Sequence, residues 1–146
     1  MKNIKKNMEN NFYQILDFPS FESTNGALAM FQGNDVESSK KLPFKIKRVL
    51  VMKGMSVGDV RGGHTHHKTR QFLLAISGGC TVELFDGKQK AEIKLGEFNK
   101  GVILEPYVWH VMKEYEPNTI LLVLADSEYD EKDYIRSYDD FLKFVK

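Results

Sequence analysis

The chain has 146 residues, with 21 Lys or Arg against 20 Asp or Glu, so its formal net charge is +1, and 42% of its residues are hydrophobic. A chain of this length suits one domain, which buries about two-thirds of its surface without disulfide or metal staples. A neutral chain lacks the basic stripe that binds a phosphate backbone, and no apolar run approaches the roughly 20 residues of a membrane span. We expect one soluble domain over residues 1–146, with no nucleic-acid or membrane partner.

Cysteine usage and the first residues bear on the compartment. The single cysteine, Cys80, cannot form an intramolecular disulfide. Residues 1–7 show no apolar segment after their lysines, so nothing in them indicates export. We therefore expect a cytoplasmic protein, with residues 1–11, rich in Lys and Asn, as a flexible start.

Most of the chain alternates between apolar and polar residues, which is typical of strands. After an early strand region at 12–31, we predict strands at 27–31, 44–52, 71–76, 80–85, 91–95, 101–104, 110–115 and 119–125, with a polar loop at 33–41. Asp86-Gly87 is the clearest hairpin turn, because a two-residue primed turn needs positive φ. Short strands at a spacing of roughly 8–12 residues favour an antiparallel sandwich or barrel.

The pattern changes from Asp130 onward. Apolar side chains then recur at helical spacing, at Tyr134, Ile135, Tyr138, Phe141, Leu142 and Val145. This spacing predicts one helix that packs on the barrel. The predicted fold class is therefore all-β, a small antiparallel β-barrel or jelly roll with a C-terminal α-helix.

Three of the four histidines, His64, His66 and His67, lie within four residues. In an extended chain His64 and His66 share one face, while His67 faces the other way. Two adjacent imidazoles are a poor filling for the interior of a small barrel. The pattern predicts that His64 and His66 line a cavity with chemistry, and that His67 is a surface residue.

The spacing around these histidines resembles the first motif of the cupin superfamily. Its positions are Gly58, His64, His66, Gln71 and Gly78, with Gln71 where a glutamate usually stands. Segment 101–110, with Pro106 and a final His110, is similar to the second cupin motif, although its proline-to-histidine spacing departs from the common form. Together the two elements cover the central half of the chain, and the resemblance implies a cupin fold.

A narrower resemblance lies in segments 44–49, 61–68, 106–110 and 123–136. They are similar to the sugar 3,4-ketoisomerases, RmlC-like cupins that act on dTDP-linked 4-keto-6-deoxyglucose in deoxyamino-sugar biosynthesis. The resemblance spans roughly residues 20–146. It implies an isomerase that moves the keto group from C4 to C3 through an enediol, with no cofactor. It also implies a homodimer that exchanges N-terminal strands, for which the long loop at 33–41 gives room.

Two kinds of chemistry fit the histidines. A pKa of ~6.5 suits imidazole to proton transfer, and by resemblance His64 is the base at C3 while His66 handles the other transfer. A metal cupin would instead use His64, His66, Gln71 and His110, but a glutamine lacks the charge of the usual carboxylate, so we predict no metal. A metal-dependent enzyme with three histidine ligands, or a non-catalytic sugar-binding cupin, remains the alternative.

Five further residues are candidates for substrate binding, namely Arg48, Arg61, Gln71, Trp109 and His110. Arginine pairs bidentately with a diphosphate, and the charge of Arg48 lies in an apolar strand where it needs a partner. Arg61 would face away from the histidines in a regular strand, but Gly62 and Gly63 permit a bulge that re-aims it. Gln71 and His110 are expected in the cavity, and Trp109 either fills the barrel or stacks on the substrate. These residues do not fix the configuration of the product at C4.

Overall fold

The computed structural model describes residues 12–33 and 41–146. Its strands are β1 (Gln14–Asp17), β2 (Ser20–Ser23), β3 (Gly26–Ala29), β4 (Arg48–Met52), β5 (Arg61–His66), β6 (Gln71–Ser77), β7 (Cys80–Phe85), β8 (Lys90–Leu95), β9 (Lys100–Leu104), β10 (Trp109–Lys113), β11 (Ile120–Ala125) and β12 (Tyr134–Ile135). The helical elements are the 3₁₀ turn η1 (Glu131–Asp133) and the helix α1 (Tyr138–Phe144).

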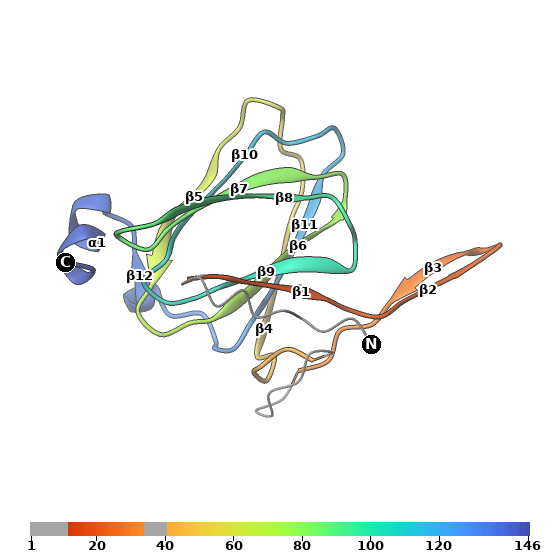
Figure 1. The fold of residues 1–146 in the computed structure, drawn as a ribbon, viewed down its shortest axis with the longest axis horizontal. Helices are drawn as coiled ribbons and strands as arrows, with labels where there is room; N and C mark the ends of the chain where they lie inside the picture. Colours follow the sequence, from red (N-terminus) through yellow and green to blue (C-terminus); the bar gives the residue numbers. More distant parts are fainter. Residues whose placement is uncertain (1–11, 34–40) are drawn as a thin grey trace.

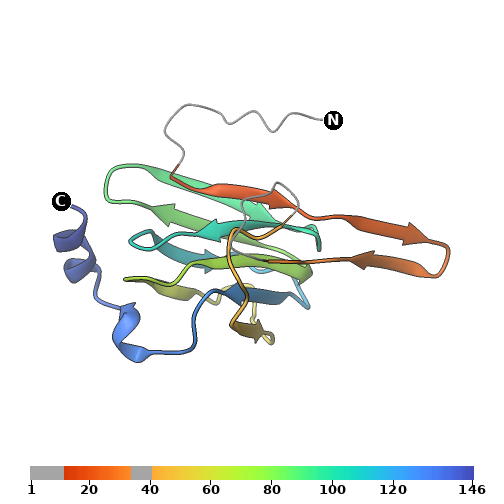
Figure 2. The ribbon, with the colours of Figure 1, turned by 90° about the horizontal axis from the view of Figure 1, so that it is seen from below.

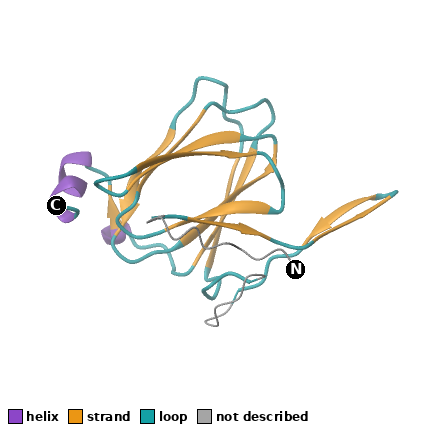
Figure 3. Ribbon diagram, viewed as in Figure 1, coloured by secondary structure: helices purple, strands orange, loops and turns teal. Residues whose placement is uncertain are grey.

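Ten of the strands form two antiparallel sheets that face each other (Figure 1). The first has the order β1-β9-β6-β11-β4, and the second has the order β12-β5-β10-β7-β8. Figure 3 shows that strands build most of the body and that the helical elements lie at one end. The predicted all-β fold with a C-terminal helix is confirmed.

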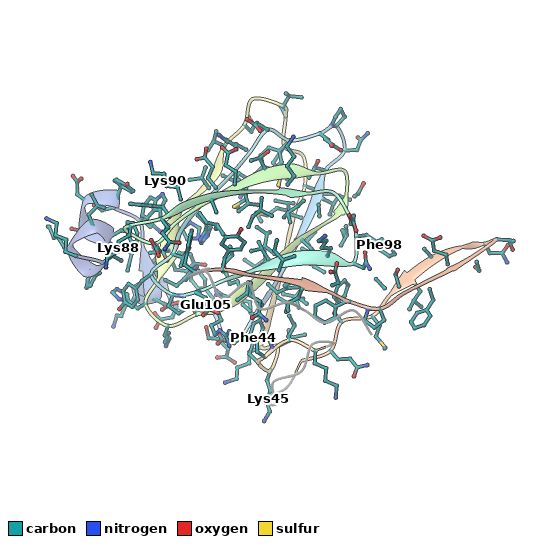
Figure 4. The ribbon with its side chains drawn as sticks, viewed as in Figure 1. Phe44, Lys45, Lys88, Lys90, Phe98 and Glu105 are labelled. Atoms are coloured by element: carbon teal, nitrogen blue, oxygen red, sulfur yellow. The ribbon has the colours of Figure 1, made fainter. Side chains whose placement is uncertain are left out.

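The main core lies between the two sheets, where side chains fill the space (Figure 4). Alternation along each strand decides which residues enter it. Leu73 and Ala75 of β6 point inward and join Val82 and Leu84 of β7 in one buried cluster. Inward positions at one end of this same space carry the polar residues described below.

A second apolar cluster covers the outer face of the first sheet. Phe72 and Leu74 of β6 point outward, and both are completely buried. Phe18, Leu42 and Phe44 pack over them from the segments that flank β2 and β3. Both faces of β6 are therefore buried, which explains its almost continuous apolar sequence.

The hairpin of β2 and β3 projects from the body in both views (Figures 1 and 2). Its apolar side chains Phe21 and Leu28 are 60% and 58% exposed. At the edge of the first sheet, Val49 and Val51 of β4 are exposed to a similar degree on the outer face. The described residues thus show two apolar surfaces without a cover.

Two predicted elements differ from the structure in their bounds. The predicted helix from Asp130 is wrong over 130–137, because Tyr134 and Ile135 pair with β5 as a strand, and α1 begins only at Tyr138 after the cap Ser137. The predicted strand 44–52 begins at Arg48. The flexible start at 1–11 and most of the loop at 33–41 lie outside the described residues. Among the described residues no helix is long and apolar enough to cross a membrane.

Candidate active site

Three histidines meet at one end of the space between the sheets. His64 of β5 lies directly opposite His110 of β10, and their ring centroids are 4.6 Å apart. The ring of His66 lies 5.2 Å from that of His64 and 6.2 Å from that of His110. His66 and His110 are buried, and His64 is half-buried. The structure therefore brings together the histidines of the two predicted motifs.

A bulge in β5 shapes this end of the sheet. The register between β5 and β10 shifts after His110, so that Val111 lies opposite Gly62 and Gly63 is the extra residue. Both glycines have positive φ, and a Cβ at Gly62 would lie 2.8 Å from the carbonyl oxygen of His110. The expected bulge is present, and it places Arg61 opposite the inward-facing Met112, although the side chain of Arg61 is exposed.

A buried carboxylate holds His66. The Nδ1 atom of His66 lies 3.0 Å from Oδ2 of Asp133, which is 4% exposed. Asp133 also accepts hydrogen bonds from the Lys68 backbone N–H, at 2.8 Å, and from the Thr69 hydroxyl. Its own carbonyl accepts from the His67 N–H, which ties η1 to the end of β5. The sequence patterns gave no role to Asp133, because only the pairing of β12 with β5 brings it here.

Tyr134 forms a wall beside the histidines. It lies opposite His66 in the β12–β5 pair, and its ring centroid is 4.4 Å from that of His66 and 5.2 Å from that of His64. The guanidinium of Arg136 lies over the ring of Tyr134, 4.3 Å from the ring centroid. Arg136 also pairs bidentately with Glu131. This segment carried part of the sequence resemblance, but sequence reasoning gave none of these residues a role.

The first sheet contributes Arg48 and Gln71. Arg48 lies opposite Ala125, and Ala125 in turn lies opposite Gln71, so the two polar residues flank one small side chain in a single row. Both share the inward face with apolar neighbours on their strands, Leu50 for Arg48 and Leu73 for Gln71. The Nε and Nη1 atoms of Arg48 are buried and have no hydrogen-bond partner among the described residues. An arginine in this state is suited to an anionic ligand.

Two sequence candidates lie elsewhere. Trp109 points to the outer face of the second sheet, where it packs on Tyr138 and Phe141 of α1, so it does not share a cavity with the histidines. It lines a hollow of about 370 Å³ that contains no histidine. His67 also points away from the cluster, and its Nδ1 atom lies 3.0 Å from the Tyr107 hydroxyl. His67 is half-buried rather than the free surface residue that we expected.

Burial keeps the three imidazoles neutral. Burial and the neighbouring His66 lower the pKa of His64 to about 4. The hydrogen bond to the Gly62 carbonyl and the negative charge of Glu131 act in the opposite direction and raise this pKa, but by less. Burial also lowers the pKa of His66, although its hydrogen bond to Asp133 opposes the shift. Burial, followed by the two other histidines, lowers the pKa of His110 well below its ordinary value. Neutral imidazoles have lone pairs, so the cluster can accept protons.

These shifts predict acid lability. An unfolded histidine binds a proton below pH 6.5, whereas folded His64 does so only near pH 4, so the unfolded state binds more protons between these values. The free energy of unfolding is therefore expected to fall as the pH drops from 6.5 to about 4. Urea unfolding at several pH values measures this dependence. The variant His64→Asn should show a smaller slope in the same window, and an unchanged slope would contradict the assignment.

The same three side chains are the set that could hold a metal ion, since one ring nitrogen from each lies within 4.8 Å of the others. Neutral imidazole is a good ligand for zinc and for iron. The fourth cupin position is Gln71, whose amide brings no negative charge. The donor set of this group is thus three neutral nitrogens.

Comparisons with known proteins identify the family of the chain. Residues 11–146 match the protein family described as "FdtA: WxcM-like, C-terminal". The chain is 36% identical over 138 residues, 94% of each chain, to the TDP-4-oxo-6-deoxy-alpha-D-glucose-3,4-oxoisomerase of Aneurinibacillus thermoaerophilus. Among solved structures, a histidine-to-asparagine variant of the 3,4-ketoisomerase QdtA from Thermoanaerobacterium thermosaccharolyticum, in complex with TDP-4-keto-6-deoxyglucose, is 30% identical, with a TM-score of 0.84 and 91% and 93% coverage. The TDP-fucose-3,4-ketoisomerase WlaRA of Campylobacter jejuni is 32% identical, with a TM-score of 0.82 and 93% and 97% coverage. The chain therefore belongs to the FdtA/WxcM-like family of cupin domains.

Proposed function

We propose that this protein is a TDP-sugar 3,4-ketoisomerase that converts TDP-4-keto-6-deoxyglucose to its 3-keto isomer, in the biosynthesis of deoxyamino sugars. The observation that carries the proposal is the pair of inward-facing histidines, His64 and His66, whose neutral rings lie 5.2 Å apart. The 36% identity to a TDP-4-oxo-6-deoxy-alpha-D-glucose-3,4-oxoisomerase supports this substrate class.

The reaction moves a hydrogen from C3 to C4 and a proton from the C3 oxygen to the C4 oxygen. The hydrogen on C3 is acidic because it is α to the C4 carbonyl, so its removal leaves an enediolate. Protonation of C4, together with loss of the proton of the C3 hydroxyl and gain of a proton by the C4 oxygen, then produces the 3-keto sugar. Both rings are neutral and share one face of β5, which suits them to proton transfer. By the family resemblance, we assign the proton removal at C3 to His64 and the other transfer, at C4 or between the oxygens, to His66.

Binding of the nucleotide is assigned to the arginine of the first sheet. The Nε and Nη1 atoms of Arg48 have no hydrogen-bond partner within the described chain, and the negatively charged oxygens of a diphosphate would accept from them. Gln71 in the same row supplies an amide for a sugar hydroxyl, and Arg61 lies at the other end of β5 for a further phosphate contact. His110, packed against His64, orients that ring.

Incubation with TDP-4-keto-6-deoxyglucose in deuterium oxide tests the reaction. NMR of the product should show the 3-keto isomer with deuterium at C4, together with its configuration. A substrate that stays unlabelled and unchanged would refute the proposal.

The alternative of a metal-dependent enzyme rests on the three-histidine set. The two readings differ in the effect of chelation. A ketoisomerase that works by histidine proton transfer keeps its turnover after dialysis against a strong chelator, whereas a metal enzyme loses it and regains it when zinc or iron is restored. Elemental analysis of the active protein is the matching measurement.

We further propose a homodimer in which the N-terminal hairpins are exchanged. The hairpin of β2 and β3 projects from the body with Phe21 and Leu28 exposed (Figure 2). The edge strand β4 exposes Val49 and Val51, together with an unpaired backbone edge among the described strands. An exposed apolar edge strand is normally covered. The hairpin of a second copy would pair with the backbone of β4 and would bury the apolar side chains of both the hairpin and β4.

The double variant Phe21→Glu, Leu28→Glu is expected to convert the dimer to a monomer, because two carboxylates cannot be buried unpaired in the interface. Light scattering should give about twice 16.8 kDa for the wild type and 16.8 kDa for the variant. Val57→Glu is the matched control, since Val57 is 66% exposed and lies outside the hairpin and β4. A monomeric wild type would contradict the proposal.

Residues 1–146 are proposed to act as one cupin domain in the cytoplasm. Support comes from the two sheets, each of which takes strands from both halves of the chain, and from Cys80, which is free and buried.

A further inference from the structure

The buried contact between Asp133 and His66 fixes where the histidine carries its proton. Both oxygens of Asp133 are occupied as acceptors, Oδ1 by the Lys68 N–H and Oδ2 by the Thr69 hydroxyl and the His66 ring. Because both oxygens already accept hydrogen bonds from other donors, the carboxylate is also the acceptor in its contact with His66, so the proton of His66 lies on Nδ1.

The other ring nitrogen of His66, Nε2, then carries a lone pair. The Nε2 atom is buried and has no hydrogen-bond partner among the described residues. The two neighbouring imidazoles are held differently, His64 by the carbonyl of Gly62 and His110 by the carbonyl of Val108 at 3.4 Å. Within this cluster only His66 is hydrogen-bonded to a carboxylate. A carboxylate has a full negative charge, so it stabilises a protonated imidazole more than the backbone carbonyls at His64 and His110 do.

We propose that Asp133 is a positioning residue for the reaction, which fixes His66 with Nε2 as the proton acceptor and stabilises the imidazolium that forms there. This inference rests on the proposed ketoisomerase function. In the step that His66 carries, the O–H bond of the C3 hydroxyl breaks, its electron pair stays on the sugar, and an N–H bond forms at Nε2. The same proton returns to the sugar when the enediolate collapses, so Asp133 is unchanged over the cycle.

The variant Asp133→Asn tests the role because it keeps the shape and reverses the tautomer. The Lys68 N–H needs an acceptor, so the amide oxygen takes the place of Oδ1 and the amide NH₂ faces Nδ1 of His66. Nδ1 then accepts, and Nε2 carries the proton and no longer receives one. We expect kcat to fall by about 10²–10⁴-fold with a KM within about threefold of the wild type, as for general-base histidines that lose the correct tautomer.

Three measurements separate this role from a structural one. Nitrogen NMR of the His66 ring, assigned with His66→Asn, should show Nδ1 protonated in the wild type and Nε2 protonated in Asp133→Asn. Glu128→Gln, which removes an exposed carboxylate close in sequence, should keep wild-type kcat. Thr69→Val removes one donor to Asp133 but leaves the carboxylate on His66, so it should lower stability with kcat within about fivefold.

The proposal fails if folded Asp133→Asn keeps kcat within threefold of the wild type, or if wild-type His66 is protonated on Nε2. It also fails if the loss of activity follows the unfolded fraction in thermal unfolding. An inactive wild type would overturn the proposed function instead, and the NMR measurement would still decide what Asp133 does to His66.

Discussion

Replacing His64 by asparagine is expected to lower the turnover of TDP-4-keto-6-deoxyglucose by about 10²–10⁴-fold, the usual contribution of a general base. Asparagine has a similar size near the backbone but no lone pair of comparable basicity. Deuterium incorporation at C4 should be lost with turnover, because both depend on removal of the C3 proton. KM should change little, because the substitution removes the base and leaves the other proposed binding groups in place.

His67→Asn is the matched control for this experiment. His67 lies on the opposite face of the strand end and contacts Tyr107 and Phe144 instead of the cluster. Its loss should leave turnover within about threefold and lower stability only by the contribution of one hydrogen bond, about 1 kcal/mol. Equal losses in the two variants would show that the effect of His64 comes from damage to the strand.

Replacing Arg48 by methionine is expected to raise KM by about 10–100-fold while the free energy of unfolding stays the same or increases. A hydrogen bond to a charged group contributes about 1.5–3 kcal/mol, and each 1.4 kcal/mol is a factor of ten in affinity. The buried Nε and Nη1 atoms of Arg48 have no hydrogen-bond partner in the described chain, although the guanidinium lies over the ring of Tyr129, so an apolar side chain of similar volume removes an unfavourable burial. Titration with TDP and urea unfolding measure the two effects.

Arg70→Met is the matched control, for which we expect lower stability and an unchanged KM. Arg70 donates to both oxygens of Glu105, which is labelled in Figure 4, and both side chains are about one-third exposed. Its replacement should lower the free energy of unfolding by about 1 kcal/mol and leave KM unchanged, since an exposed pair contributes little more than this. If Arg48→Met instead loses stability at constant KM, Arg48 has a structural role.

The sequence predicted those elements in which the local pattern of apolar and polar residues matches the burial of the side chains in the fold. The strands of the core alternate as their burial requires, and the two histidine motifs meet because β5 and β10 are neighbours in the second sheet. The bulge at Gly63 was also foreseeable, since only glycine adopts this backbone easily. The resemblance to the ketoisomerases identified the family that the comparisons confirm.

The features that sequence reasoning missed depend on contacts between distant parts of the chain. Tyr134 and Ile135 fit a helical pattern, but pairing with β5 satisfies their backbone and makes them a strand. The position of Asp133 follows from that pairing, so no local pattern marked it. Trp109 neighbours His110 in sequence, yet alternation in β10 sends its ring to the opposite face, under α1.

The strand order has a consequence for how the chain folds. β4 has its described partner only in β11, and β11 also supplies one of the two neighbours of β6. Pairs this far apart in sequence give the fold a high contact order, and such proteins fold in about milliseconds to seconds rather than microseconds. On the ribosome, β4 and β6 remain exposed edges until residues 120–125 emerge, and a chain that ends before Ile120 would present both to aggregation.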